Sequence, residues 1–280
     1  MDVKFEPCPM CGHPSAKMND GYHCFFCGRD WENQPVPTQS KSTFLYKQNE
    51  QIMTQAHKNL LNNIDGSLDY CLRRGIKMGT IMDWHLGYVP NQFSRMPVSW
   101  WQRILFPIMS NDGTRVIAFG GRKTTVDDRA KYMNSPNGPT YKKSESLYGY
   151  SLVPEDAEKV YLCEGYVDVL SMDSSGFAYP VASLGTSLTA EQALLIRKKA
   201  QHIVLCYDND EAGQKNTLRA IDLLIKAGFK TPEISVLVVS DAKDVDEALQ
   251  HGCTLCEKSL LRYLSEREEY ELFVNALINN

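Results

Sequence analysis

The sequence lacks the features that would place it in a membrane or send it out of the cell. Its 280 residues are 43% hydrophobic, yet they contain no apolar run of the roughly 18 residues that a membrane-spanning helix needs. The N-terminal segment MDVKFEPCPMC has no apolar signal-peptide core. These absences predict a cytoplasmic protein with no membrane partner. Since cytoplasmic thiols stay reduced, the nine cysteines are expected to bind metal or to pack in a core, not to form disulfides.

The sequence also lacks a G-x-x-x-x-G-K-[ST] motif, which excludes a fused helicase ATPase of the P-loop class. A strong overall charge is missing too, because the net charge is only −4. The charge is unevenly distributed, however: residues 95–154 carry +5 and residues 155–280 carry −9. This pattern suits an enzyme that holds a polyanion with a basic surface and performs chemistry in an acidic half. Chance clustering on a solvated face is the alternative.

Two cysteine pairs stand near the N-terminus, twelve residues apart. Thiolates two residues apart in a tight turn can reach the same ion, and two such pairs complete the tetrahedron that Zn²⁺ prefers. The pattern predicts one structural zinc in a zinc-binding domain over residues 1–33. A closed site of four ligands has no open position for catalysis, so the module is expected to be structural or to recognise a partner. The predicted zinc ligands are Cys8, Cys11, Cys24 and Cys27.

The next segments change character along the chain. Residues 34–50 are polar, contain Pro35 and Pro37, and are interpreted as a linker. Residues 51–90 have leucine and isoleucine spacings typical of helices, broken at Gly75. Short strands are predicted over 104–108 and 116–119, followed by loops rich in lysine and arginine. Residues 51–154 are therefore expected to form a basic mixed α/β subdomain that binds nucleotide or template.

From residue 159 onward, predicted strands and helices alternate. The strands lie near 160–163, 179–183, 203–207 and 234–239, and Thr189 with Gln192 predicts a capping box at one of the helices between them. Alternation of this kind is typical of parallel strands with crossover helices, whose sites form beyond the carboxyl ends of the strands. An α/β domain over 155–250 is expected, followed by a helical tail over 251–280. The Cys253-x-x-Cys256 pair in that tail is interpreted as ordinary thiols, with a second metal site as the alternative.

Acidic residues follow three of these four strands. Glu164 follows the first, Asp208 and Asp210 follow the third, and Asp244 and Asp246 follow the fourth. Carboxylates crowded at one edge repel one another unless a cation lies among them, and hard oxygen ligands suit Mg²⁺ or Mn²⁺. Any single acid could instead be a helix cap or a loop charge. The agreement of several strand ends favours a divalent-metal site that acts on phosphates.

These residues resemble a known family. EGYVDVL and LCYDNDEAG resemble a Toprim domain, and RILFPI, VIAFGGRK, KYMNSP, KKSESLYGY and VASLGTSLTAEQ resemble the RNA-polymerase domain of DnaG-type primases. The resemblance covers roughly residues 1–250. It implies a zinc ribbon, a basic mixed α/β subdomain and a Toprim domain with a parallel Rossmann-like sheet. It also implies a DNA primase that copies single-stranded DNA into a short RNA primer from NTPs.

The resemblance assigns roles to individual residues. Glu164, Asp208 and Asp210 are the expected catalytic residues, and together with Asp168, Asp244 and Asp246 they are the expected magnesium ligands. The residues expected to hold template or nucleotide are Arg74, Arg103, Arg122, Lys131, Asn134 and Lys143. Cys11 stands where many cellular primases have histidine, and Lys243-Asp244-Val245-Asp246 replaces the usual Asp-Pro-Asp. These departures and the short chain favour a compact, phage-type primase that works with a separate replicative helicase.

Two other classes remain open from the sequence. A Toprim nuclease would share the acidic residues but would cut DNA without using NTPs. A non-catalytic zinc-ribbon protein that binds single-stranded DNA would need no intact metal site. Incorporation of labelled NTPs distinguishes all three.

Overall fold

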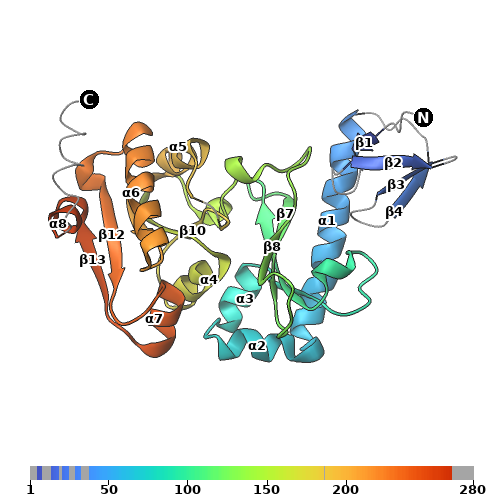
Figure 1. The fold of residues 1–280 in the computed structure, drawn as a ribbon, viewed down its shortest axis with the longest axis horizontal. Helices are drawn as coiled ribbons and strands as arrows, with labels where there is room; N and C mark the ends of the chain where they lie inside the picture. The colour runs from blue at the N-terminus through green and yellow to red at the C-terminus, as the bar shows by residue number, and fades with distance from the viewer. Residues whose placement is uncertain are drawn as a thin grey trace. The chain divides into compact units, whose positions relative to one another are not determined.

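The computed structural model describes the backbone of residues 5–7, 14–18, 21–24, 29–32, 38–185 and 187–266, and the side chains from residue 42 onward within these ranges. The chain divides into two compact units, Met1–Ser146 and Leu147–Asn280. Figure 1 shows the elements of each unit. The boundary lies eight residues before the one expected at 154/155.

The first unit begins with an antiparallel sheet in the order β1-β2-β3-β4. Its strands are Phe5–Pro7, Pro14–Met18, Gly21–Cys24 and Arg29–Glu32. Cys24 ends strand β3, and the side chains of all four predicted zinc ligands lie outside the described residues. The predicted zinc site therefore stays a prediction.

Helix α1 spans Thr38–Leu61 and corrects the predicted linker. Residues 38–50 belong to this helix, because Leu45 extends the apolar face of Met53, Ala56 and Leu60, all of which are buried. The single leucine was too weak a signal among so many polar residues.

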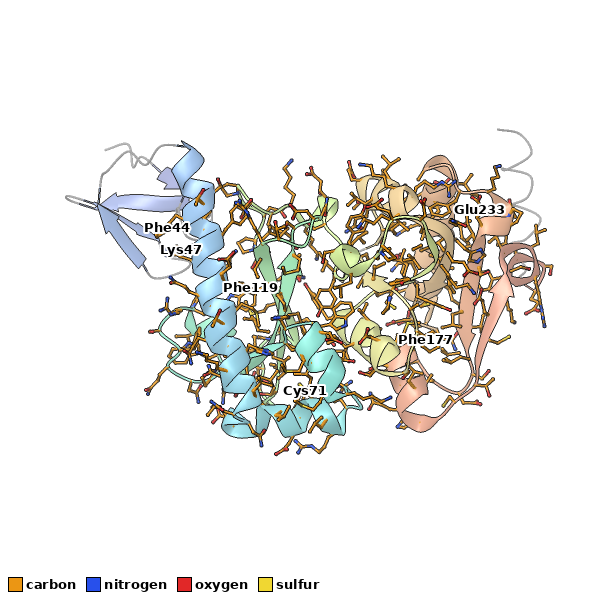
Figure 2. The ribbon with its side chains drawn as sticks, turned by 180° about the vertical axis from the view of Figure 1, so that it is seen from behind. Phe44, Lys47, Cys71, Phe119, Phe177 and Glu233 are labelled. Carbon is orange, nitrogen blue, oxygen red and sulfur yellow. The ribbon has the colours of Figure 1, made fainter. Side chains whose placement is uncertain are left out.

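The first unit continues with short helices and a second antiparallel sheet in the order β5-β6-β7-β8. Helix α1 packs on this sheet closely at Gly87, where an added Cβ would lie 2.7 Å from the Cβ of Ala56. Phe119 of β7 lies in the core between them with Leu105 and Trp100 (Figure 2). The helices are η1 Ile64–Gly66, α2 Ser67–Arg73, α3 Met78–Asp83, η2 Val98–Trp100 and η3 Lys143–Glu145. The strands are β5 Gly87–Val89, β6 Arg103–Met109, β7 Val116–Lys123 and β8 Tyr132–Asn134.

The second unit is built on a sheet in the order β10-β9-β11-β12-β13. Strands β9 to β12 are parallel, as predicted, and β13 runs antiparallel to β12. The strands are β9 Ala157–Cys163, β10 Pro180–Ala182, β11 Ala200–Cys206, β12 Ile234–Val239 and β13 Leu255–Ser259. The helices are η4 Tyr150–Leu152, α4 Tyr166–Ser174, α5 Ala190–Lys199, α6 Glu211–Lys226, η5 Thr231–Glu233, α7 Val245–His251 and α8 Leu260–Ser265.

Successive side chains of these strands point to opposite faces of the sheet, and both faces pack against helices. Val160, Leu162, Ile203 and Leu205 pack into the core that α5, α6 and α8 share. Cys163 faces the other way and contacts Met172 of α4, with 3.4 Å between the sulfur atoms. Because both faces are buried, the strands are nearly continuous apolar runs.

Two further predictions can be compared with this unit. The capping box of Thr189 and Gln192 at the start of α5 is confirmed. The predicted helical tail is wrong over 255–259, which form strand β13. Its charged residues pointed to a solvated helix, but main-chain pairing with the apolar strand β12 decides the structure.

Candidate functional site

The predicted acids gather at the carboxyl ends of β9, β11 and β12. Glu164 follows β9, Asp208 lies two residues after β11, and Asp244 begins the helix that follows β12. The main-chain N–H of Asn209 donates to the carbonyl of Lys243 at 2.7 Å and so ties two of these loops together. The sheet thus brings together acids that lie up to 82 residues apart in the sequence.

Two glycines let this edge close tightly. At Gly213, in the first turn of α6, an added Cβ would lie 2.1 Å from the carbonyl oxygen of Asp208. At Gly165, an added Cβ would lie 2.9 Å from the Oδ2 of Asp168. Any larger residue would displace one of the two aspartates. Gly213 is the glycine of the DNDEAG sequence. Only the structure shows that a glycine is needed there because a side chain would collide with Asp208.

Some of the acids are already used by the protein. Asp210 caps α6 by accepting from the N–H of Gly213 at 2.8 Å, and Asp244 caps α7 by accepting from the N–H of Glu247 at 2.7 Å. The sequence left helix capping open as the alternative role of any single acid, and the structure shows that role for both of these residues. Each cap uses one carboxylate oxygen, and the other oxygen of Asp244 forms an ion pair with the Nζ of Lys243 at 3.1 Å.

Asp246 lies deeper than the other acids. It is 6% exposed, and its Oδ1 accepts hydrogen bonds from Ser171 Oγ on α4 and from Gln250 Nε2, the latter at 2.7 Å. This carboxylate therefore joins α7 to α4. Ser171 and Gln250 carried no motif, so sequence reasoning missed them.

The remaining acids lie where charge is unfavourable without a cation. Burial, and then repulsion from Asp244, Asp208 and Asp246, raise the pKa of Asp168 to about 8. Burial, followed by Glu164, Asp244 and Asp210, raises the pKa of Asp208 to about 6.

The charge of Glu164 is also unfavourable where it lies, and the surroundings of this side chain show whether a metal would fit at this edge. Burial is the main cause that raises the pKa of Glu164, and a hydrogen bond from Asn216 opposes it. Its Oε1 is buried without a hydrogen-bond partner. An orphaned oxygen among crowded carboxylates is a hard donor set, and such a set suits Mg²⁺ or Mn²⁺. In the described part of the chain, no three acidic, cysteine or histidine side chains are already arranged around one point.

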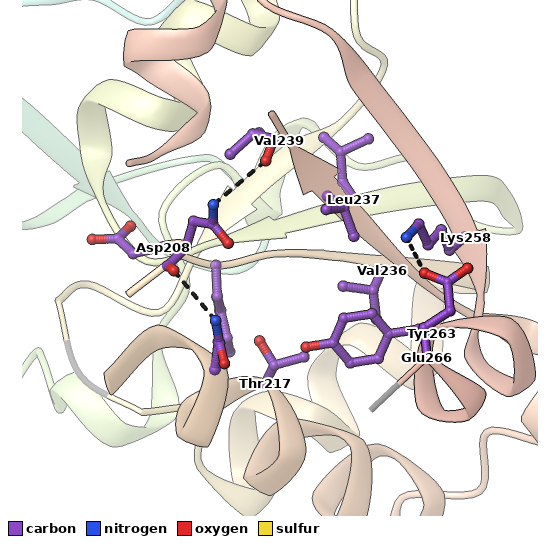
Figure 3. Close-up of a pocket in the computed structure, with 12 residues that line it drawn as sticks. Asp208, Thr217, Val236, Leu237, Val239, Lys258, Tyr263 and Glu266 are labelled. Carbon is purple, nitrogen blue, oxygen red and sulfur yellow. Dashed lines mark hydrogen bonds and ion pairs between the residues drawn. The ribbon is translucent and has the colours of Figure 1, made fainter. Parts of the chain in front are cut away.

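A pocket opens next to Asp208, between β12 and the helices α6 and α8 (Figure 3). Its volume is about 160 Å³, and its lining includes Thr217, Val236 and Tyr263. The ion pair between Lys258 and Glu266 lies at its far side. Ligand pockets typically enclose roughly 300–1,000 Å³, so this one is too small for a whole nucleoside triphosphate.

The predicted basic residues lie in the first unit, and two of them are buried. Arg103 is 1% exposed and bonded to main-chain carbonyls. Arg122 is 8% exposed, and its guanidinium donates to the hydroxyls of Tyr70, at 2.8 Å, and of Tyr132. Sequence reasoning missed both tyrosines, because they are recognisable only as partners of a buried arginine.

The other predicted basic residues are more accessible. Lys131 is exposed, with its Nζ 5.6 Å from the centre of the Tyr132 ring. Arg74 follows α2, and the charges of Arg74 and Arg122 both lower the pKa of the Cys71 thiol, against the larger effect of burial, which raises it. Of the two remaining predicted residues, Asn134 lies on β8 opposite Gly120, and Lys143 begins η3.

Comparisons with known proteins decide the family. Residues 161–249 match the Toprim-like family model, and residues 94–153 match the model of the DNA primase catalytic core, N-terminal domain. The chain belongs to the DnaG-type primases. Within this family, it is 41% identical over 164 residues to the DNA primase of Halalkalibacterium halodurans, covering 57% of this chain and 26% of that protein. It is 30% identical over 256 residues to the DNA primase of Pasteurella multocida, covering 80% and 44% respectively.

Solved primase structures share the fold. The Aquifex aeolicus primase (zinc-binding and RNA polymerase domains) aligns with a TM-score of 0.68 at 23% identity, covering 97% of this chain and 84% of that one. The DnaG primase catalytic domain bound to ssDNA aligns with a TM-score of 0.65 at 25% identity, covering 80% and 84%. The chain spans 26% and 44% of the lengths of the two curated primases, from Halalkalibacterium halodurans and Pasteurella multocida respectively. Within the described residues, no helix combines the length and hydropathy needed to cross a bilayer.

Proposed function

We propose that this chain is a DNA primase, which copies a single-stranded DNA template into a short RNA primer from NTPs. The observation that carries the proposal is the cluster of carboxylates at the ends of β9, β11 and β12, in a chain that also has the basic primase subdomain. A Toprim domain alone fits enzymes that cut, rejoin or polymerise nucleic acid. The N-terminal primase domain over 94–153 selects polymerisation.

The acidic edge would hold one or more divalent cations through Glu164, Asp208 and Asp210, with Asp168, Asp244 and Asp246 as further acids. When bound there, Mg²⁺ or Mn²⁺ supplies charge neutralisation and Lewis-acid polarisation of phosphate oxygens. The unpartnered Oε1 of Glu164 and the raised pKa values support this assignment, because a cation would remove the repulsion that raises them.

The chemical step is nucleotidyl transfer between two NTPs paired with the template. The 3′-hydroxyl oxygen of one NTP forms a bond to the α-phosphorus of the other, and the bond from that phosphorus to the pyrophosphate oxygen breaks. The hydroxyl proton would pass to water, and the divalent cation that Glu164, Asp208 and Asp210 would hold lowers the pKa of that hydroxyl. Exposed lysines such as Lys131, with Arg74 and Lys143, would bind the triphosphates and the template.

Partners and location follow from the same proposal. The four N-terminal cysteines would hold one zinc ion in a module that reads unpaired template bases. A separate replicative helicase would supply the unwound template. The protein would act in the cytoplasm of a bacterial or phage-infected cell.

A single assay tests the proposal. The protein is incubated with labelled ATP or GTP, Mg²⁺ and a library of single-stranded templates, and the products are sized. Template-dependent oligoribonucleotides are the expected products. Shortened templates without incorporation would identify a nuclease, and bound but unchanged templates would identify an accessory protein.

A further inference from the structure

Arg103 occupies an unusual place for a residue of a nucleic-acid-binding surface. It is 1% exposed, although it carries a permanent charge. Its Nε donates to the carbonyl of Ser99 at 2.9 Å, its Nη1 to that of Lys131 at 3.2 Å, and its Nη2 to that of Ala130 at 2.9 Å. The guanidinium therefore spends three of its five N–H donors on main-chain oxygens inside the protein.

Packing holds the side chain in this position. Gly121 lies beside it on β7, where an added Cβ would be 3.2 Å from Arg103 Cδ and 3.0 Å from the Trp100 ring. Burial lowers the pKa of Arg103, and the nearby Arg129 adds to the effect. A phosphate outside the protein could not reach this guanidinium without breaking the hydrogen bonds that compensate its burial.

Two of the three carbonyls that Arg103 holds, those of Ala130 and Lys131, belong to the segment that ends at the exposed Lys131. The carbonyl of Lys131 also accepts from the N–H of Lys123 at 3.0 Å. Arg129 Nη1 donates to the carbonyl of Trp101 at 3.0 Å, which ties the same segment to the start of β6 a second time. Residues 123–131 are thus fixed from two sides, and Lys131 leaves this anchored backbone as the first residue before β8.

We propose that Arg103 is a positioning residue: it fixes the backbone at Ala130 and Lys131, and so directs the Lys131 side chain at nucleic-acid phosphate without touching phosphate itself. The inference rests on the proposed function, since it takes Lys131 as the contact. It separates two residues that the family resemblance puts in the same role. Lysine cannot replace Arg103, because an ammonium group lacks the planar fork that reaches carbonyls of two neighbouring residues.

A double-mutant cycle tests the coupling. Arg103→Lys keeps the charge and removes the fork, whereas Lys131→Gln removes the contact. The affinity for a labelled single-stranded oligonucleotide is measured by fluorescence anisotropy at one salt concentration. Each single variant is expected to bind roughly three- to tenfold more weakly. The double variant is expected to bind no more than about twofold more weakly than the worse single variant.

The rate of trypsin cleavage reports how often the segment opens. This rate would not change if Arg103 only contacted phosphate. The full-length protein is digested briefly, and cleavage after Arg129 is followed by mass spectrometry. We expect Arg103→Lys to accelerate this cleavage at least about fivefold, because the released segment opens more often. Trypsin should cleave the Lys131→Gln variant after Arg129 at the wild-type rate. Lys58→Gln, which removes an exposed lysine on α1, is the control for charge and should match the wild type in both assays.

The outcomes are separable. If the two losses of affinity multiply and the cleavage rate stays unchanged, Arg103 contacts phosphate directly and the proposal is overturned. Cooperative unfolding shows whether Arg103→Lys is folded. If it is not, Arg129→Lys replaces it, because this change also loosens residues 123–131. The loss of affinity caused by Arg129→Lys must then likewise depend on the presence of Lys131. Failure of primer synthesis in the wild type would refute the proposed function, while binding and proteolysis would still decide the role of Arg103.

Discussion

Replacing Asp168 by asparagine should stabilise the protein when no divalent cation is present. The pKa of this carboxyl is raised from 3.8 to about 8, first by burial and then by the charges of Asp244, Asp208 and Asp246. Because the folded-state pKa lies above the unfolded one, the stability from the protonated carboxyl is complete below about pH 4. It is lost as the pH rises from about 4 to about 8.

The size of the effect follows from the shift. Each pKa unit corresponds to about 1.4 kcal/mol, so four units set an upper bound of roughly 6 kcal/mol. Asp168 is partly exposed, and neighbouring acids share the protons, so we expect roughly 1–3 kcal/mol at pH 8. That range corresponds to about 2–10 °C in Tm. Asparagine keeps the size of the side chain and can still accept the hydrogen bond from the N–H of Asp246.

Thermal unfolding followed by circular dichroism measures the change at about pH 5 and about pH 8, with and without Mg²⁺. The wild type should lose stability between the two pH values without Mg²⁺ and regain it when Mg²⁺ is added. Asp168→Asn should show a smaller loss and a smaller response to Mg²⁺. Asp241→Asn is the matched control, because Asp241 is exposed near the same edge and its φ of 59° suits asparagine equally. If Asp168→Asn melts at or below the wild type at pH 8 without Mg²⁺, the crowding of carboxylates does not destabilise this site.

Three further changes have defined outcomes. Asp246→Ala should lower the free energy of unfolding by roughly 1–3 kcal/mol in urea titrations, because it leaves the Ser171 hydroxyl and the Gln250 amide without their acceptor. An unchanged unfolding midpoint would contradict the link between α4 and α7. Lys131→Gln should reduce the salt dependence of single-strand binding by about 0.7 in slope, whereas Lys58→Gln should not, and equal slopes would remove Lys131 from the phosphate contacts. Cys24→Ser should abolish stoichiometric zinc in metal analysis of the purified protein, and retained zinc would exclude the predicted ligand set.

The parallel sheet was predictable because its strands are apolar runs that end in turn signals. Strands β9, β11 and β12 were expected within a few residues of their observed bounds. The position of the acids at one edge followed directly, since parallel strands end on the same side. Residues 38–50 and 255–259 were predicted wrongly because one leucine or a charged edge strand gives little periodic signal, and tertiary packing decides such segments.

The individual roles of the site residues were less predictable. The sequence put Asp246 and Asp208 in the same set of magnesium ligands, yet Asp246 is buried and accepts hydrogen bonds from Ser171 and Gln250. Arg103 was expected to contact phosphate, although its partners are main-chain carbonyls, two of them 27 and 28 residues away. Motifs identify residue types that a family needs. They do not reveal which side chains the protein uses to hold its own backbone.

The most direct test of the account is dinucleotide synthesis by Asp208→Ala. The variant and the wild type are given Mg²⁺, labelled NTPs and a single-stranded template, and single-strand affinity is measured in parallel. We expect synthesis to fall at least about 100-fold, because the variant loses charge stabilisation worth several kcal/mol at the reacting phosphate, while template affinity changes less than about twofold. Asp222→Asn, an exposed acid on α6, should behave like the wild type. Synthesis by Asp208→Ala at near the wild-type rate would contradict the assignment of the acidic edge as the catalytic centre.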